Sequence, residues 1–253
     1  AIPAVTKGLT AKVPPTANSG SALDIVAGEP ATHGPTGGLR ALAFDGSPGT
    51  DAPPDTLGGY LMTPFGPDPT GIGVDVDGVD DPCEAGGRIG FDPSMTHVVI
   101  GSGWASWSHG YTGDVYHPVG YVALTELDIT LPPGSCAFYL YVEPNPFDLF
   151  WIECIANPGT EDEVSSGQVM VNGSSGATYF GFYGEGLDTI KVLADSAANG
   201  FAVGEFGMAC YCEPVFGACC DYAAEGGVTC EDEVEPAACR GEFQRWGLGE
   251  ECA

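Results

Sequence analysis

Apolar and polar positions alternate with a period of two along most of the chain beyond residue 38. Between residues 121 and 131, Leu127 and Ile129 fall on one parity, whereas Glu126 and Asp128 fall on the other. This period is typical of a strand with one buried face, because successive side chains of a strand point to opposite sides. The pattern therefore predicts strands and not amphipathic helices, of which none is convincing before residue 220.

Short apolar runs of this kind recur at near-regular spacing. We expect strands at Leu39–Phe44, Leu57–Phe65, Arg88–Phe91, His97–Ile100, Gly103–Ser108, Thr112–Tyr116, Cys136–Glu143, Asp148–Ala156, Gln168–Val171, Ala177–Tyr183, Asp188–Ala194 and Gly200–Cys212. The 39 glycines and 21 prolines, about a quarter of the chain, lie mainly in the turns between the runs. The pattern predicts an all-β fold, a β-sandwich of the jelly-roll type, with a barrel as the alternative.

Two pairs of runs have the spacing of hairpins. Cys136–Glu143 and Asp148–Ala156 are joined by a Pro-Asn-Pro turn, and Gln168–Val171 and Ala177–Tyr183 are joined by NGSSG. In the first hairpin, residues opposite each other have numbers that sum to about 290 if the turn is centred near Asn145.

The first twenty residues also alternate, and they differ from the rest in charge. One parity of this segment contains Val5, Lys7, Leu9, Ala11 and Val13. The segment has two lysines and no acid, so its net charge is +2, whereas the remainder has five basic and 35 acidic residues. A terminal strand with an apolar face needs a sheet to join, and the acidic body would attract this one.

Composition divides the chain into three parts. Residues 1–37 are expected to form a donor-like strand followed by a tether rich in Pro, Gly, Ser and Thr, which begins at residue 14. Residues 38–211 are expected to form the β-sandwich domain. Residues 212–253 contain many cysteines and acids and are expected to form a small disulfide-rich module.

Charge and cysteine content restrict the class of protein. A net charge of −28 argues against a nucleic-acid partner, because phosphate binding needs a basic surface. No run reaches the roughly 18 apolar residues of a membrane span. Ten cysteines indicate an oxidising compartment, and a chain that starts Ala-Ile-Pro-Ala is expected to follow a removed signal peptide. We expect a secreted, extracellular protein.

The cysteines are expected to form disulfides. Cys136 and Cys154 satisfy the sum of 290 and are therefore predicted to be bonded across the first hairpin. The remaining pair outside the tail, Cys83 and Cys210, would tie an acidic loop to the last strand.

The tail needs internal bridges, because about 40 residues bury too little surface to fold alone. Its cysteines are Cys212, Cys219, Cys220, Cys230, Cys239 and Cys252. Three bridges among them are expected, and the sequence does not choose among the 15 connectivities. A zinc site is the competing interpretation, although the spacing matches no common zinc motif and the tail has no histidine.

The sequence GVDVDGVDDPC contains four aspartates around a glycine: Asp75, Asp77, Asp80 and Asp81. Calcium prefers several carboxylate oxygens on a tight turn, so this loop is a candidate site for a structural Ca²⁺. A solvated acidic turn is the alternative, since the final acid of an EF-hand loop is absent.

We expect no enzymatic activity. His97, His109 and His117 lie close to Asp114 in sequence, but on separate strands or turns. Packed aromatic residues with polar neighbours explain this segment better than an acid–base pair or a metal site. The acids on apolar strands, namely Glu143, Glu153 and Glu205, are expected to face solvent or a hydrogen-bond partner rather than to form a glycosidase pair.

One face of the predicted first hairpin is aromatic. Tyr139, Tyr141 and Trp151 share it, with Trp104 and Trp107 on nearby strands. If this face is exposed, it offers a surface for stacking sugars or for packing on another subunit. The alternative is that it forms a second buried layer.

Signals for glycosylation are present. Asn172-Gly173-Ser174 is an N-glycosylation sequon that also reads as a turn. Thr6, Thr10 and Thr16 lie in a proline-containing segment and are candidates for O-linked sugars. Covalent or bound glycans are therefore expected partners.

Several segments resemble known proteins. GWASWSHGYTGDVY, AFYLYVEPNPF, VNGSSGATYFGFY and GFAVGEFG resemble stretches of secreted β-sandwich proteins of environmental bacteria, over roughly residues 38–210. The tail resembles a Cys-rich module that recurs in secreted proteins of similar organisms. Neither resemblance implies an activity. The overall plan resembles subunits of extracellular fibrils, in which an N-terminal strand docks into the next subunit.

These observations together favour a structural subunit of an extracellular fibril, a homopolymer built by insertion of residues 3–13 into the neighbouring copy. The alternative is a secreted carbohydrate-binding module that uses the aromatic face.

Overall fold

The computed structural model describes residues 41–83, 86–212, 217–222, 228–234 and 244–248. The first sixteen strands are β1 (Ala43–Asp45), β2 (Thr56–Leu57), β3 (Tyr60–Leu61), β4 (Thr63–Pro64), β5 (Asp75–Asp80), β6 (Arg88–Ile100), β7 (Gly103–Trp104), β8 (Asp114–Pro118), β9 (Glu126–Thr130), β10 (Ala137–Pro144), β11 (Leu149–Ala156), β12 (Val164–Ser165), β13 (Val169–Asn172), β14 (Thr178–Tyr183), β15 (Thr189–Ala194) and β16 (Phe201–Met208). Two 3₁₀ turns, η1 (Val119–Tyr121) and η2 (Ser196–Ala198), are the only helical elements within these ranges. The prediction of an all-β fold is confirmed.

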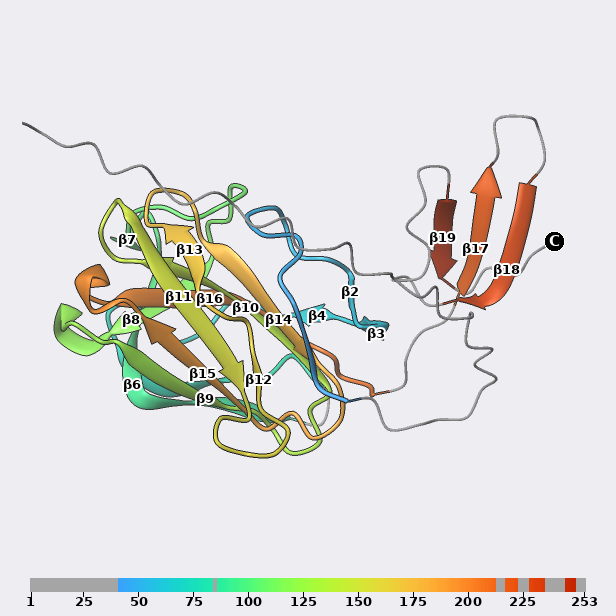
Figure 1. The fold of residues 1–253 in the computed structure, drawn as a ribbon. Coiled ribbons are helices and arrows are strands. Elements are labelled where there is room, and N and C mark those ends of the chain that lie inside the picture. The colour runs from blue at the N-terminus through green and yellow to red at the C-terminus, as the bar shows by residue number, and fades with distance from the viewer. Residues whose placement is uncertain (1–40, 84–85, 213–216, 223–227, 235–243, 249–253) are drawn as a thin grey trace, which may run out of the picture. The chain divides into compact units, whose positions relative to one another are not determined.

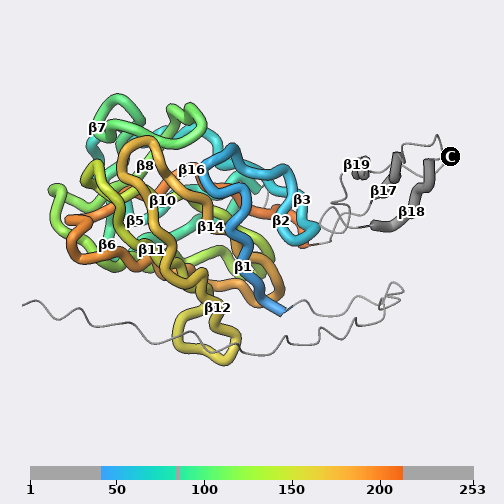
Figure 2. The backbone as a smooth tube through the Cα atoms, turned by 45° about the horizontal axis from the view of Figure 1, so that its top comes forward, coloured from blue at the N-terminus to red at the C-terminus, as the bar shows by residue number. Residues whose placement is uncertain are grey.

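Ten strands form one continuous, nearly closed and barrel-like path. Their order is β1-β14-β10-β16-β8-β6-β9-β15-β11-β12, and every neighbouring pair is antiparallel (Figure 1). β5, β7, β13 and β4 pair with members of this path. The two end strands, β1 and β12, approach within 8 Å between Cα atoms (Figure 2), yet no ladder joins them in the described part of the chain.

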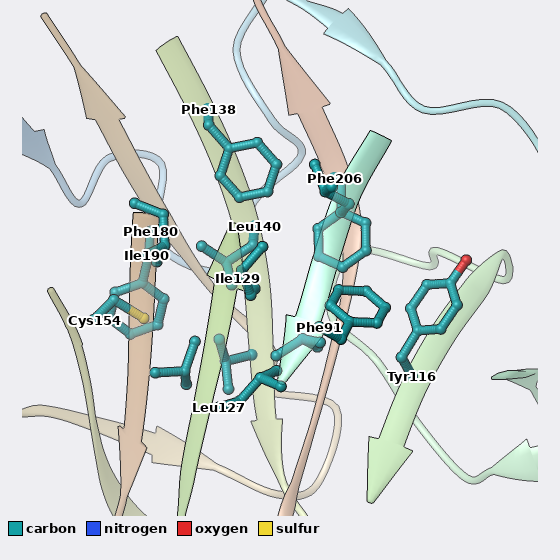
Figure 3. Packing of buried hydrophobic residues seen from close by; sticks show 14 of the residues in the cluster. Phe91, Tyr116, Leu127, Ile129, Phe138, Leu140, Cys154, Phe180, Ile190 and Phe206 are labelled. Carbon is teal, nitrogen blue, oxygen red and sulfur yellow. The ribbon is translucent and has the colours of Figure 1, made fainter. Parts of the chain in front are cut away.

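The interior of the barrel is a single apolar core. Its fully buried members include Phe138 and Leu140 from β10, Ile129 from β9 and Cys154 from β11 (Figure 3). Alternating residues of each strand point inward, as the period-two pattern predicts. Burial of these side chains is the main favourable contribution to folding, at roughly 25 cal/mol per Å² of apolar surface.

A second apolar cluster covers the outer face of β10, so that all eight residues of this strand are buried. Tyr139 and Tyr141 belong to this cluster and are at most 1 % exposed, together with the buried indoles of Trp104 and Trp107. Trp151 is half-buried on β11, in another part of the sheet. The exposed aromatic face is therefore wrong, and the second buried layer is correct for both tyrosines.

Neither predicted hairpin forms. β10 pairs with β14 and β16, whereas β11 pairs with β12, β13 and β15. The Pro-Asn-Pro segment therefore carries the chain across the barrel instead of turning it back beside itself. In the same way β13 pairs with β11, and β14 pairs with β10 and β1. Alternation fixes which face a residue occupies, but it does not fix the neighbouring strand.

The disulfides follow from this topology. Cys83 is bonded to Cys210, which confirms that pairing. Cys136 is bonded to Cys212, and Cys154 is a free, buried thiol. The predicted Cys136–Cys154 bond is wrong because the strands of the two residues are not neighbours. Two disulfides indicate that the protein folds in an oxidising environment.

The tail contains a separate three-stranded antiparallel sheet in the order β18-β17-β19, formed by β17 (Gly217–Tyr222), β18 (Val228–Val234) and β19 (Gln244–Leu248). Because Cys212 bonds to Cys136, three bridges within the tail are no longer possible and that expectation is wrong. The side chains of Cys219, Cys220, Cys230, Cys239 and Cys252 lie outside what the structure describes, as does any pairing among them.

Candidate functional site

Glu143 is a buried carboxylate at one end of the barrel. It lies near the end of β10 and is 1 % exposed. Its oxygens accept hydrogen bonds from Nε1 of Trp104 at 2.6 Å, from the backbone N of Gly176 at 3.2 Å and from Oγ of Ser106 at 3.3 Å. Burial raises the pKa of Glu143, and these donors offset only part of the rise.

These contacts join segments that are distant in sequence. Trp104 and Ser106 lie in and just after β7, and Gly176 lies in the turn between β13 and β14. A carboxylate with donors on both oxygens holds its partners in fixed positions, since each lost bond would leave a buried polar atom unpaired. Glu143 therefore fixes the loops at one end of the barrel.

Glu205 is a second acid on an apolar strand, partly buried, and it lies in a β-bulge. The register between β10 and β16 shifts between Tyr139 and Tyr141, so that Glu205 and Phe206 lie opposite Leu140 alone. Glu205 has a φ of 50°, in the left-handed region that non-glycine residues rarely occupy. Bulges and backbone strain of this kind are over-represented at functional sites because they re-aim a side chain.

Glu205 is paired with His109, whose φ is also left-handed at 37°. Nε2 of His109 lies 2.7 Å from Oε1 of Glu205, and Nε1 of Trp107 donates to Oε2 at 2.9 Å. Nδ1 of His109 lies 3.0 Å from Oγ of Ser108 and 3.2 Å from the backbone O of Thr50. Burial raises the pKa of Glu205, and the hydrogen bond to His109 partly opposes the rise.

By distance, Ser108, His109 and Glu205 form a row of a hydroxyl, an imidazole and a carboxylate, as in nucleophilic catalysis. Ser108 is only 2 % exposed, however, and none of the three lines either of the two cavities described below. A nucleophile must reach its substrate, so access is missing here. The row anchors the backbone at Thr50 and the segment around His109 to the bulge.

The three histidines do not converge. Nε2 of His97 lies 2.8 Å from Oδ1 of Asp114, and Nδ1 of His117 lies 2.8 Å from the backbone O of Pro118. Burial lowers the pKa of His117, which favours its neutral form. Among the described residues, no group of three or more His, Cys, Asp or Glu side chains is placed to hold a metal.

The predicted calcium ligands lie on a strand and not in a loop. β5 contains Asp75, Asp77 and Asp80, and its ladder with β6 holds them in extended backbone. Asp77 and Asp80 both face Arg88, with N–O distances of 2.5 and 3.9 Å. Hydroxyl Oγ1 of Thr96 donates to Asp75, and the backbone N of Cys83 donates to Asp81. The expected cluster around one ion is therefore not formed, because an arginine and local donors take the carboxylates.

We consider two of the cavities formed by the described residues. The larger, of about 500 Å³, lies beside β5 and is lined by Asp68, Asp80, Asp81 and Arg88 together with prolines and glycines. The smaller, of about 190 Å³, is lined by Gly103, Trp104, Ala105, Tyr121, Glu143, Asn145, Phe147 and Gly173. The sequence had singled out Glu143 as an acid on an apolar strand, but nothing in the sequence linked it to Tyr121 or Phe147.

The other predicted sites are placed as follows. Asn172 is exposed at the end of β13, and its Oδ1 accepts a hydrogen bond from the backbone N of Ser174, as in an Asx turn. The candidate O-glycosylation positions Thr6, Thr10 and Thr16 lie outside the described residues. So does the whole N-terminal strand, Val5, Lys7, Leu9, Ala11 and Val13 included.

Comparison with known proteins adds no relative: no family model, no curated protein and no solved structure matches the chain. In the part of the chain that the structure describes, no helix has the length and hydrophobicity needed to cross a bilayer.

Proposed function

We propose that the protein is a secreted structural subunit of an extracellular fibril, in which residues 3–13 of one copy add as a strand to the sheet of the next. The observation that carries the proposal is the open edge of this sheet. β13 pairs with β11 along one edge, and no other ladder of the described chain uses its second edge, where a single isolated bridge joins Asn172 to Gly176. An unpaired edge presents N–H and C=O groups that a further strand can satisfy.

The core is incompletely covered where the sheet ends. Leu42 and Phe44, in and before β1, pack against the core but stay partly exposed. The same holds for Val164 in β12 and Val169 in β13. An apolar strand added at the edge of β13 would remove the remaining surface of Val169 from water, which is favourable. The sequence pattern of residues 3–13 supplies apolar side chains of one parity for this purpose.

Spacing selects the acceptor edge. β1 and β12 approach within 8 Å, whereas a strand inserted between two others needs about 9.6 Å, twice the usual strand spacing. β12 and β13 lie one after the other along the same edge of β11. The free edge of β13 is therefore the edge that is left to accept the added strand. In this proposal the barrel-like sheet is a jelly-roll-like sandwich that a neighbour completes.

Charge supports docking between copies. The N-terminal segment is positive and the rest of the chain strongly negative, so encounter with the next body is electrostatically favoured. A head-to-tail contact that does not close on itself produces a filament. The protein is non-enzymatic in this proposal, and the carbohydrate-binding alternative loses the face on which it was based, since Tyr139 and Tyr141 are buried.

Deletion of residues 1–13 tests the proposal. We expect the full chain to form filaments visible by electron microscopy, and the deleted chain to remain monomeric with an unchanged far-ultraviolet circular dichroism spectrum. Equal filament formation by the two proteins would refute strand addition, as would a full chain that stays monomeric by sedimentation under all conditions in which it is folded.

A mixing experiment separates exchange between copies from folding back. One preparation carries Thr10→Cys and the other Met170→Cys, a position that is 60 % exposed on β13. Strand addition between copies predicts disulfide-linked dimers of the two variants. Leu61→Cys, at a position that is 45 % exposed elsewhere on the protein, is the matched control and should not form such dimers with Thr10→Cys. Crosslinking only within a chain that carries both Thr10→Cys and Met170→Cys would show that the arm closes its own domain.

A further inference from the structure

Two exposed aromatic side chains border the smaller cavity although they come from different connections of the sheet. Tyr121 ends η1 and is 55 % exposed, and Phe147, between β10 and β11, is 68 % exposed. Exposed aromatic surface is unfavourable in water, so two such rings at one opening mark a surface that faces a ligand.

Tyr121 is held firmly in this position. Its φ of 54° and the φ of 67° at Gly120 place two successive residues in the left-handed region. Its ring stacks on His117 with centroids 4.0 Å apart, and its hydroxyl donates to the backbone O of Gly103 at 3.2 Å. A strained backbone that is fixed on both sides of the ring is the expected form of a preorganised wall.

The floor of the cavity is equally fixed. Trp104 stacks on His117, the same ring that Tyr121 contacts, with centroids 6.2 Å apart. The indole of Trp104 donates to Glu143. The turn after β13 approaches so closely that a Cβ on Gly173 would lie 1.9 Å from the backbone O of Pro146. The cavity is therefore built from close backbone contacts and one buried carboxylate, and it does not need a ligand to form.

Chemistry narrows the ligand to a neutral one. The protein carries a net charge of −28, which disfavours anions. Glu143 is 1 % exposed and already accepts bonds from Trp104, Ser106 and Gly176, so its charge is compensated and is not offered to a cation. The rest of the lining consists of three aromatic residues, three small residues and Asn145, whose Nδ2 donates to the backbone O of Asn199 at 3.4 Å.

Size narrows the ligand further. The volume of about 190 Å³ is below the roughly 300–1,000 Å³ of pockets for drug-sized ligands. A pyranose ring fits these features, because its C–H faces pack on aromatic rings while its edge hydroxyls pair with polar groups. We propose that the cavity between Tyr121 and Phe147 binds one neutral sugar ring. This site is independent of polymerisation, and a bound glycan would be held near the end of β13.

Binding of simple glycosides to the folded full chain tests the site. The probes are the methyl glycosides of glucose, galactose, mannose and N-acetylglucosamine. Their binding is followed by saturation-transfer NMR and by the tryptophan fluorescence of the protein. We expect saturable binding of at least one glycoside, weakened about tenfold or more by Tyr121→Ala and by Phe147→Ala. Tyr211→Ala is the matched control, since Tyr211 is an aromatic residue 72 % exposed away from the cavity, and it should leave binding unchanged.

Three results would overturn the inference. The first is the absence of saturable binding by any of the four glycosides to the folded protein. The second is an equal loss of binding in Tyr211→Ala and in the cavity variants. The third is saturable binding of tetramethylammonium in place of the glycosides, which would assign the aromatic walls to a cation. Circular dichroism of each variant verifies that it remains folded, and none of these outcomes depends on whether filaments form.

Discussion

Nε2 of His109 lies 2.7 Å from Oε1 of Glu205, and both residues hold the left-handed backbone that a side chain ordinarily avoids. Each such residue costs about 1–3 kcal/mol, so the surrounding structure must over-determine this contact. The surroundings do so through Trp107, which donates to the same carboxylate, and through the second apolar cluster that packs around it. The raised pKa of the Glu205 carboxyl at this contact makes the stability of the molecule depend on pH.

The first prediction concerns this sensitivity. Burial raises the pKa of Glu143 and of Glu205 above the ordinary 4.5. The folded protein therefore takes up these protons at a higher pH than the unfolded chain does. The free energy of unfolding should increase as the pH falls from the raised values towards 4.5, and decrease as the pH rises through the same window. Thermal unfolding followed between about pH 4 and about pH 8 should show a maximum on the acidic side of neutrality.

Substitution identifies the groups responsible. Glu205→Gln removes one titrating carboxyl and should flatten the dependence, whereas Glu161→Gln, at an exposed position, should leave the profile unchanged. Asp77 acts in the opposite direction, because the hydrogen bond from Arg88 lowers its pKa below 3.8, and its contribution is lost as the pH falls through that lowered value. A melting temperature that rises steadily from pH 5 to pH 8 would contradict this account.

The second prediction concerns the buried indole of Trp104. Trp104→Phe keeps an aromatic ring but removes the donor to Glu143, which leaves a buried carboxylate with one partner fewer. We expect a loss of about 1–3 kcal/mol in the free energy of unfolding, measured by urea denaturation. Trp151→Phe is the matched control and should cost less, because Trp151 is half-buried and its indole N–H has no hydrogen-bond partner among the described residues. Equal losses would show that ring volume matters and the hydrogen bond does not.

The third prediction uses two glycines. Gly173→Ala would place a methyl group 1.9 Å from the backbone O of Pro146, so the turn after β13 must move and the protein should be destabilised. Gly66→Ala meets no atom within 4 Å and should have almost no effect. The measurement is the melting temperature of each variant, which should be lowered by Gly173→Ala and unchanged by Gly66→Ala. If Gly173→Ala melts like the wild type, the close approach at this turn is not as tight as the structure shows.

The fourth prediction concerns the cysteines. Loss of the Cys136–Cys212 bond through Cys212→Ser should destabilise the protein by about 2–4 kcal/mol. Cys154 is fully buried, and burial raises the pKa of its thiol, so it should resist alkylation by iodoacetamide until the chain is denatured. Urea denaturation measures the first result. Peptide mapping of the alkylated protein under non-reducing conditions measures the second. A peptide in which Cys154 is bonded to Cys136 would restore the hairpin interpretation and contradict the sheet order.

The positions of the strands were predictable because each strand lies against an apolar core, and alternation records that burial directly. β11 and β16, for example, begin and end within a few residues of the predicted runs. β5 was missed, because its aspartates, Asp75 and Asp77, suggested a metal-binding loop. The ladder with β6 and the charge of Arg88 explain how an acidic segment remains extended.

The pairing of strands was not predictable in the same way. Phe138, Ile152 and Cys154 all reach the core, as the alternation along their strands requires. They reach it from opposite walls of the barrel, because β10 and β11 are not paired. The predicted inward face of each strand is therefore correct, and the predicted pairing of the two strands is wrong. In a closed barrel the inward faces of all strands pack in the same core. The alternation within one strand therefore does not tell which strands are its neighbours in the sheet.

The candidate site shows the same division. Glu143 and Glu205 attracted notice as acids on apolar strands, and both found hydrogen-bond partners as expected. Their partners Trp104 and Trp107 lie 39 and 98 residues away in sequence. Such pairs depend on the bulge in β16 and on the crossing between β10 and β11, which are properties of the assembled sheet.

The two disulfides among the described residues also determine how the molecule bears mechanical load. Both leave the chain immediately after β16, from Cys210 and Cys212, and they lead to Cys83 and to Cys136. Tension applied to the chain beyond Cys212 is therefore passed through sulfur to the start of β10, a strand buried on both faces. β16 is not peeled from its end one hydrogen bond at a time. The pull must instead shear β10 between β14 and β16, where many bonds resist together.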